Sequence, residues 1–277
     1  MNTIETTTTI VRSADGTHIA AFRTGAGPAI ILIDPALSTH KGSTKLSSAL
    51  AEHFSVVSYD RRGRGGSGDE SPDSADPDRE VDDISAVVDE AGGRAILFGT
   101  SSGAALALYA AARLGDRITG VVAYEPPYIC DDSRPPLAAD LPERIAASVA
   151  AGDRSGAAKA FFVEAIGVPA VGVAVMRMLP LWRDAKALTH TLRYDFALLD
   201  GTQQGEALHA DRWAGLTAPT IVLVGSKSEK FFHHTARSLA VLLPTAEYES
   251  LEGAHHGSPE MSPSGIARRI IDRFGAD

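Results

Sequence analysis

The stretch LFGTSSGAALAL at residues 97–108 decides the fold, because an apolar run ends in it and an alanine-rich run begins. It contains the pattern G-x-S-x-G, from Gly99 to Gly103, at a point where a buried strand is expected to give way to a helix. Glycines at both ends allow a sharp turn in which the middle residue, Ser101, takes a strained conformation that exposes its hydroxyl. Small residues also occur at such turns for packing alone, so the pattern by itself does not establish chemistry.

Strands buried on both faces are predicted on both sides of this turn, because unbroken apolar runs recur along the chain. The runs are AIILID at residues 29–34, FSVVSYD at 54–60, RAILFG at 94–99, ITGVVAYE at 118–125 and TIVLVG at 220–225. Residues 5–24 add two β-rich stretches around the turn signal SADG. Helical patterns lie between and after these runs, at residues 76–93, 102–114, 232–243 and 262–274. This alternation predicts an α/β fold with a mostly parallel central sheet flanked by helices.

One long segment interrupts the alternation, because the chain from about Pro126 to Thr217 contains helical patterns and no strand-like run. We therefore expect residues 126–217 to form a helical cap inserted into a core made of residues 1–125 and 218–277. Large apolar side chains of such an insertion either pack in its own core or line a substrate pocket. The candidate substrate-binding residues are Phe161, Met178 and Trp182 in the insertion and Leu37 in the loop after the first apolar run.

Composition and charge exclude several classes of protein. The chain has 277 residues, of which 44% are hydrophobic and 22% charged, as is usual for a soluble globular protein. A net charge of -9 argues against a nucleic-acid partner, and neither a secretion signal nor a membrane-spanning run is recognisable. The single cysteine, Cys130, cannot form an internal disulfide, which fits a reducing compartment. The sequence predicts a cytoplasmic protein with a small-molecule substrate and leaves its oligomeric state open.

Four features together make the chain resemble the α/β-hydrolase fold superfamily over nearly its whole length. They are IILIDPALS after the N-terminal hairpin, YDRRGRGGSGD at residues 59–69, GTSSG, and LEGAHHGSPEMSPSG near the C-terminus. The resemblance implies a serine hydrolase with a helical cap, in which Ser101 is the nucleophile. It also implies that the D-x-R-G-x-G-x-S pattern is a structural loop beside the active site, so Arg61 and Arg64 are not expected to be catalytic.

A serine nucleophile needs a histidine base, which is oriented in turn by a carboxylate. The resemblance assigns the base to His256 or His255, which lie between a short final strand and the last helix. His256 is favoured, because relatives tend to have a proline seven residues after the base and Pro263 stands at that distance. Two other histidines, His233 and His234, do not indicate a metal site, because adjacent residues on a helix point apart. No metal is expected.

The carboxylate departs from the usual pattern. Most relatives carry it as G-x-x-D after the strand that matches TIVLVG, where this chain has Ser228. Glu125 is the favoured substitute, because a charged residue that ends an apolar strand is costly to bury unless it is paired, and some members of the superfamily take their acid from that strand. Glu229 is the alternative acid. A Ser-His dyad and an acid elsewhere in the chain also stay open.

The oxyanion loop departs as well, because relatives often show His-Gly after the first buried strand and this chain has Asp34-Pro35. Proline has no amide hydrogen, so alignment assigns the oxyanion hole to the amide of Ala36, together with that of Ser102 at the start of a helix. Asp34 is either a turn residue or a carboxylate that faces the pocket and favours a polar or cationic substrate group.

The expected function is hydrolysis of an ester or a related acyl bond by a Ser-His-acid triad, without a cofactor. The same site also suits C-C bond hydrolysis, acyl transfer, cyclisation or cofactor-free peroxidation, because a fold does not fix the chemistry. A third hypothesis, from another class, is a receptor that binds a small ligand without reaction. The presence of both Ser101 and His256 counts against this third hypothesis.

Overall fold

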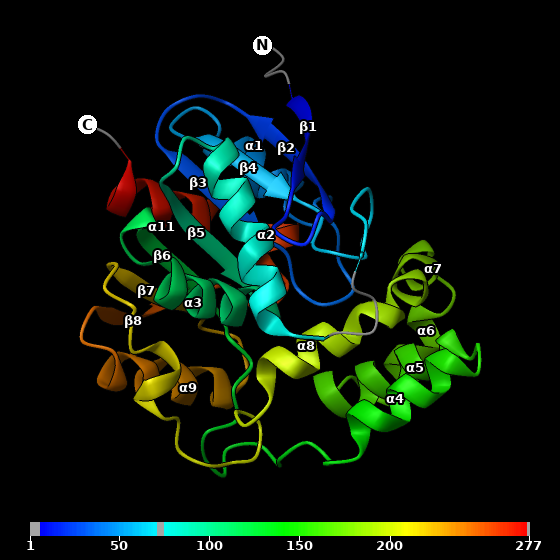
Figure 1. Ribbon diagram of the computed structural model, residues 1–277. Coiled ribbons are helices and arrows are strands. Elements are labelled where there is room, and N and C mark those ends of the chain that lie inside the picture. The colour runs from blue at the N-terminus through cyan, green and yellow to red at the C-terminus, as the bar shows by residue number, and fades with distance from the viewer. Residues whose placement is uncertain (1–5, 71–74, 276–277) are drawn as a thin grey trace.

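The computed structural model describes residues 6–70 and 75–275, so residues 1–5 of the predicted N-terminal region lie outside the described residues. A sheet runs through the middle of the molecule and helices cover both of its faces (Figure 1). Its strands are β1 Thr6–Arg12, β2 His18–Thr24, β3 Ala29–Ile33, β4 Ser55–Tyr59, β5 Ala95–Thr100, β6 Ile118–Tyr124, β7 Thr220–Gly225 and β8 Ala246–Leu251. The spatial order is β1-β2-β4-β3-β5-β6-β7-β8, in which β1 and β2 are antiparallel and the strands from β4 to β8 are parallel. The predicted hairpin and mostly parallel sheet are confirmed.

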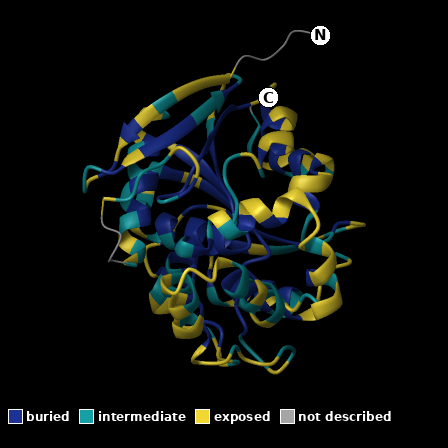
Figure 2. Ribbon diagram, turned by 90° about the vertical axis from the view of Figure 1, so that its right-hand side faces the viewer, coloured by how far each residue is buried: buried dark blue, intermediate teal, exposed yellow. Residues whose placement is uncertain are grey.

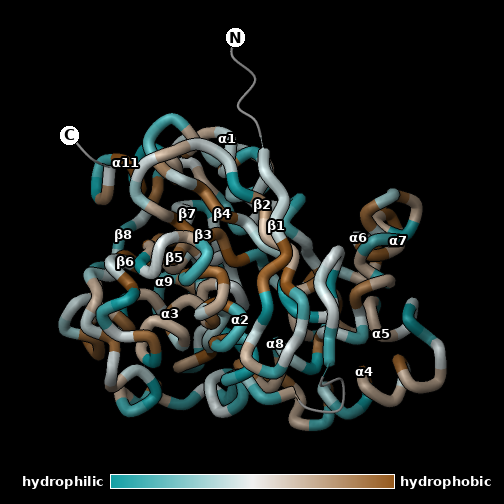
Figure 3. Tube along the Cα trace, turned by 45° about the horizontal axis from the view of Figure 1, so that its top comes forward, coloured by the Kyte–Doolittle hydropathy of each residue, from teal (hydrophilic) through white to brown (hydrophobic). Residues whose placement is uncertain are grey.

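Two apolar clusters, one on each face of the sheet, form the core. Successive strand residues point to opposite faces, so Ile31 and Leu97 belong to one cluster and Ile30 and Ile96 to the other. The first face is covered by α2 Pro77–Glu90, α3 Ser102–Leu114 and α9 Lys230–Leu242, and the second by α1 Thr44–Leu50 and α11 Ser264–Phe274. Figure 2 shows the strands mostly in the colour of buried residues, and in Figure 3 the hydrophobic colour gathers along them. Burial on both faces explains why their sequences are nearly continuous apolar runs.

The predicted last helix, residues 262–274, is observed as α11 Ser264–Phe274. A short helix, α10 Ser258–Met261, precedes α11, and Pro263 stands at the N-cap position of α11. A proline is compatible with this position because the first amides of a helix lack an intrahelical acceptor.

Between β6 and β7 every described regular element is helical. The helices of this region, residues 126–217, which we call the helical segment, are α4 Leu141–Ala150, α5 Arg154–Ala160, a π-helix Phe161–Ile166, α6 Ala170–Met176, α7 Pro180–Ala187 and α8 Leu192–Leu199. Single 3-10 turns occur at Thr189–Thr191 and Ala210–Trp213, and a third, Gly115–Arg117, follows α3. In Figure 1, α4 to α7 stand beside the sheet, and α8 runs from them back to it. Within residues 6–70 and 75–275, no helix combines the length and the apolar character needed to cross a membrane.

Candidate active site

Ser101 lies in a tight turn between β5 and α3. Its φ is 54° and its ψ is -121°, a conformation that residues other than glycine rarely adopt. The turn requires glycine on both sides, because a Cβ on Gly99 would lie 2.1 Å from the carbonyl oxygen of Gly103, and one on Gly103 would lie 2.2 Å from that of Ile33. The amide of Ser101 donates to the carbonyl of Tyr124 at 2.9 Å, so the turn is tied to the end of β6. Ser101 is thereby held at the carboxyl end of the sheet.

Glu125 and His256 form a hydrogen-bonded pair at the same edge of the sheet. Nδ1 of His256 lies 2.6 Å from Oε2 of Glu125, and Oε1 of Glu125 accepts from the amide of Gly225 at 2.7 Å and from the hydroxyl of Ser228 at 2.5 Å. Glu125 is fully buried, and these three hydrogen bonds offset the cost of burying its charge. Because an ionised carboxylate can only accept, Nδ1 donates and Nε2 of His256 is left as the nitrogen that can take a proton.

The ring of His256 is held from the side as well, because it stacks on Phe232 of α9 with the ring centroids 4.8 Å apart. The His256 side chain is 37% exposed, so the ring remains accessible from solvent. Within the described residues, the hydroxyl of Ser101 makes no hydrogen bond to His256. Such bonds are often long in ligand-free enzymes and shorten when the substrate is bound.

The two alternatives left open by the sequence lie elsewhere. Glu229 is exposed at the N-cap position of α9 and, among the described residues, makes no hydrogen bond to a histidine. Nδ1 of His255 accepts from the amide of Gly257 at 3.2 Å, and its carbonyl accepts from the hydroxyl of Tyr124 at 2.8 Å. The structure therefore brings Glu125 to His256 and turns His255 toward its own backbone.

The remaining histidine pair is bonded to separate partners. Nδ1 of His233 lies 2.9 Å from the hydroxyl of Tyr248, and Nδ1 of His234 lies 2.5 Å from Oδ2 of Asp131. In the part of the chain that the structure describes, no group of three or more potential ligands is arranged to hold a metal ion.

The predicted oxyanion loop needs a correction at Ala36. Its amide donates to Oγ of Ser102 at 2.9 Å, so the expected role of Ala36 as oxyanion donor does not fit this geometry. The next amide, that of Leu37, makes no hydrogen bond among the described residues, and Leu37 has an unusual φ of 57°. The amide of Ser102 stands at the first position of α3, where it has no intrahelical acceptor. The amides of Leu37 and Ser102 are thus the candidate oxyanion donors that this loop and the start of α3 leave available among the described residues.

Comparison of the sequence with models of known protein families identifies the family of this chain. Residues 30–269 match the model of the alpha/beta hydrolase family. The chain belongs to this family. A search of curated protein sequences finds no match.

Solved structures extend the likeness over almost the whole chain. An alpha/beta hydrolase from Sphaerobacter thermophilus DSM 20745 is 43% identical, with a TM-score of 0.87 and coverage of 96% of this chain and 100% of that one. A hydrolase from Pseudomonas aeruginosa PA01 is 24% identical, with a TM-score of 0.75 and coverage of 97% and 98%. A thermophilic esterase from Thermogutta terrifontis is 19% identical, with a TM-score of 0.70 and coverage of 97% and 98%. At the two lower identities the likeness shows the fold alone.

In this alpha/beta hydrolase Asp34 is buried, in contrast to the pocket carboxylate considered from the sequence. The residue is 5% exposed, and its Oδ2 accepts from the hydroxyl of Ser43 at 2.9 Å. Burial raises the pKa of Asp34 to about 8, although the hydrogen bond from Ser43 opposes the shift, and nearby Glu260 adds to it. Asp34 is therefore mostly neutral at pH 7, and it does not offer a negative charge to a cationic substrate group.

The raised pKa of Asp34 predicts that the free energy of unfolding falls as the pH rises from about 4 to about 8. Over that range the folded protein keeps a proton on Asp34 that the unfolded chain, with an ordinary pKa of 3.8, has released. Asp34→Asn keeps an acceptor for Ser43 and is expected to make the decline shallower. Urea unfolding of both proteins at pH 5 and at pH 8 measures this, and an equal decline in the two proteins would contradict the prediction.

The loop of residues 60–69 carries buried arginines, as expected if this loop has the structural role that the family resemblance implies. Nε and Nη2 of Arg61 donate to the carboxylate of Glu80 at 2.7 and 2.8 Å, and Nη1 donates to Oδ1 of Asp195 at 2.8 Å. Nη2 of Arg64 donates to Oδ2 of the same aspartate at 2.7 Å. Asp195, which lies on α8 of the helical segment, was not among the residues predicted from the sequence, because no local pattern indicates a partner that is more than a hundred residues away.

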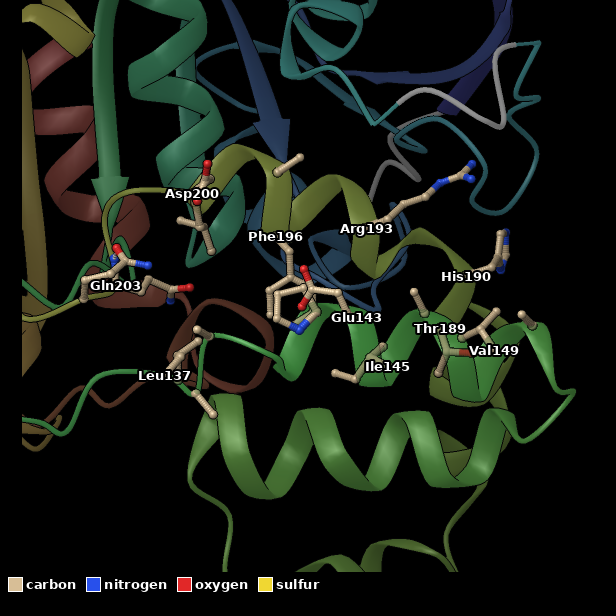
Figure 4. A pocket seen from close by; sticks show the side chains of 18 residues that line it. Leu137, Glu143, Ile145, Val149, Thr189, His190, Arg193, Phe196, Asp200 and Gln203 are labelled. Carbon is tan, nitrogen blue, oxygen red and sulfur yellow. Dashed lines mark hydrogen bonds between the residues drawn. The ribbon is translucent and has the colours of Figure 1, made fainter.

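A cavity of about 780 Å³ lies between α4 and α8 (Figure 4). Figure 4 shows Ile145 and Glu143 of α4 and Phe196 of α8 around this space. Neither Ser101 nor His256 lines it. The cavity is thus a feature of the helical segment and is separate from the residues of the candidate triad.

The predicted substrate-binding residues do not line this cavity either. Phe161 and Trp182 are 7% and 4% exposed and belong to the two small apolar clusters inside the helical segment. Leu37 packs against the cluster that contains Phe161. Met178 is 78% exposed, so it lies in neither a core nor a described pocket. Packing inside the helical segment therefore accounts for Phe161 and Trp182 and does not account for Met178.

Proposed function

We propose that this alpha/beta hydrolase is a serine hydrolase that cleaves an ester or a related acyl bond of a small molecule. Ser101 is the nucleophile, His256 the general base and Glu125 the acid of the triad. The observation that carries the proposal is the hydrogen bond of 2.6 Å between His256 and a fully buried Glu125, at the sheet edge where Ser101 is held in a strained turn. A buried carboxylate that orients an imidazole, at the sheet edge where a strained turn holds a serine, is the arrangement that nucleophilic catalysis requires.

In the first step, Oγ of Ser101 attacks the carbonyl carbon while Nε2 of His256 takes the hydroxyl proton. The electron pair of the carbonyl moves to its oxygen, which accepts hydrogen bonds from the amides of Leu37 and Ser102. The imidazolium formed is stabilised by Glu125 and returns the proton to the leaving alkoxide as the ester bond breaks. Water then repeats the sequence on the acyl-serine, which releases the acid and restores the hydroxyl of Ser101.

We further propose that the helical segment is a cap over this site, with residues 1–125 and 218–277 as the core. Leu37 of the oxyanion loop packs against the apolar cluster of the segment that contains Leu141, Ile145 and Phe161, which supports this assignment. An apolar contact so close to a proposed oxyanion donor favours a substrate with an apolar acyl or alcohol part.

A fluorophosphonate probe, combined with assays on p-nitrophenyl acetate and butyrate, tests the proposed function. We expect one adduct, which tandem mass spectrometry assigns to Ser101 rather than to Ser102, together with turnover of at least one ester. An adduct on Ser101 without ester turnover would overturn the ester assignment and favour C-C hydrolysis or acyl transfer at the same serine. Absence of both adduct and turnover would overturn the enzymatic proposal and favour a ligand receptor.

A further inference from the structure

Asp195 is a buried carboxylate of the helical segment that contacts the core. Its two oxygens accept from different side chains, Oδ1 from Arg61 at 2.8 Å and Oδ2 from Arg64 at 2.7 Å, and the residue is 2% exposed. Burial opposes its ionisation, but the positive charges of Arg61 and Arg64 and a hydrogen bond with the side chain of Ser102 lower its pKa. Asp195 is therefore an anion that three groups of the core hold in place.

The same arginines also hold the oxyanion loop. Nη1 of Arg64 donates to the carbonyl of Pro35 at 2.7 Å, and Nη1 of Arg61 lies 3.4 Å from the carbonyl of Asp34. Arg64 thus bridges Asp195 to the peptide group that precedes Ala36.

That peptide group, between Pro35 and Ala36, is fixed at both ends. Arg64 binds its carbonyl at 2.7 Å, and Oγ of Ser102 accepts from its amide at 2.9 Å. Because a peptide group is planar, fixing its carbonyl and its amide fixes the whole unit as far as Cα of Ala36, so only the two backbone torsions of Ala36 separate it from the amide of Leu37. Leu37 has a φ of 57°, a strained value that persists only where the surroundings enforce it.

The two side chains that fix this peptide group, Arg64 and Ser102, both meet Asp195. We propose that Asp195 is a positioning residue for the oxyanion hole: through Arg64 and Ser102 it orients the Pro35–Ala36 peptide so that the amide of Leu37 is aimed at the developing oxyanion. Since Asp195 belongs to α8, seating of the helical segment on the core becomes a condition for full activity. This inference rests on the proposed function.

Other contacts, from α8 and from the 3-10 turn Thr189–Thr191 before it, join the helical segment to the loop of residues 60–69 without touching the oxyanion loop. The hydroxyl of Tyr194 donates to Oδ2 of Asp69 at 2.5 Å, and Nε2 of His190 lies 3.0 Å from the carbonyl of Gly63. Removing one of these contacts weakens the attachment of the helical segment to the core but leaves the series of contacts from Asp195 to the oxyanion loop intact.

The test compares Asp195→Asn in the full chain with a matched control, Glu80→Gln. Each substitution removes one carboxylate from Arg61, but only Asp195 also interacts with Arg64 and Ser102. Measured quantities are kcat and KM for p-nitrophenyl acetate, the Ki of a trifluoromethyl ketone whose serine adduct carries an oxyanion, and the thermal midpoint. We expect Asp195→Asn to lower kcat about ten- to hundredfold and to raise Ki by a similar factor, with KM within about twofold of the parent. Glu80→Gln is expected to lower the thermal midpoint comparably while kcat and Ki stay within about threefold.

An unchanged kcat and Ki in Asp195→Asn would overturn the inference, as would an equal loss of kcat in both variants. Should Asp195→Asn fail to fold, Ser102→Ala provides the second test, because it deletes the acceptor of the Ala36 amide and is expected to show the same split between kcat and KM. An unaffected Ki in Ser102→Ala would then overturn the inference. A parent that neither reacts with the fluorophosphonate nor turns over esters contradicts the proposed function, whereas an active parent with an unaffected Asp195→Asn contradicts this inference alone.

Discussion

Replacing Ser101 with alanine is expected to lower kcat for p-nitrophenyl acetate by a factor of about 10⁴ or more. The alanine lacks the oxygen that forms the acyl intermediate, so only the oxyanion donors and substrate binding can still assist attack by water. The KM of any residual reaction is expected to change little, because the hydroxyl contributes to the transition state rather than to binding. Steady-state kinetics under conditions that subtract spontaneous ester hydrolysis measure the effect.

Ser48→Ala is the control for this prediction. Ser48 is an exposed residue of α1 whose hydroxyl donates to the carbonyl of Thr44, and its replacement is expected to leave kcat unchanged. The thermal midpoint of Ser101→Ala should stay near that of the parent, because alanine occupies the same strained turn without a larger side chain. A Ser101→Ala variant that retains a tenth of the parental turnover would contradict the assignment of the nucleophile.

The second large effect is expected at Glu125. Glu125→Gln should lower kcat by about 10³- to 10⁴-fold, because a neutral amide cannot stabilise the imidazolium of His256 and can impose the wrong tautomer on its ring. The amide nitrogen of the glutamine also meets donors whichever way it is turned, since the carboxylate accepts from Gly225, Ser228 and His256. The measurement is kcat for p-nitrophenyl acetate, with circular dichroism to show that the fold is kept.

Glu229→Gln is the control that distinguishes Glu125 from Glu229 as the acid of the triad. Glu229 is exposed at the start of α9, so its neutralisation should change kcat by less than about threefold. A larger loss in Glu229→Gln than in Glu125→Gln would contradict the assignment of the acid, and it would require α9 to move toward His256 when substrate binds.

The architecture could be predicted from the sequence because it depends on local patterns. Each buried strand appears as an apolar run, and the strand-to-helix turn appears as two glycines around Ser101, which steric contacts with Gly103 and Ile33 make obligatory. The carboxylate was predictable in part for the same reason, because Glu125 is a charged residue at the end of an otherwise apolar strand. Such a residue needs a partner, and here the partner is His256.

The details of the oxyanion loop could not be predicted, because they depend on contacts between distant segments. Alignment favoured the amide of Ala36, but the hydroxyl of Ser102 occupies that amide, and a bond between positions so far apart leaves no periodic signal. Asp195 escaped notice for the same reason. Met178 was also predicted wrongly, because a large apolar residue of the insertion was expected in its core or in a pocket wall and is instead 78% exposed.

The order of the strands in the sheet has a consequence for how the protein is made. Glu125 and His256 are separated by 131 positions, and His256 follows β8, the last strand, which closes one edge of the sheet. A nascent chain on the ribosome therefore carries its serine turn long before the imidazole has been synthesised. Pairings between distant segments form slowly, so recovery of turnover during refolding reports the docking of the final strand rather than the earlier collapse around the central ones.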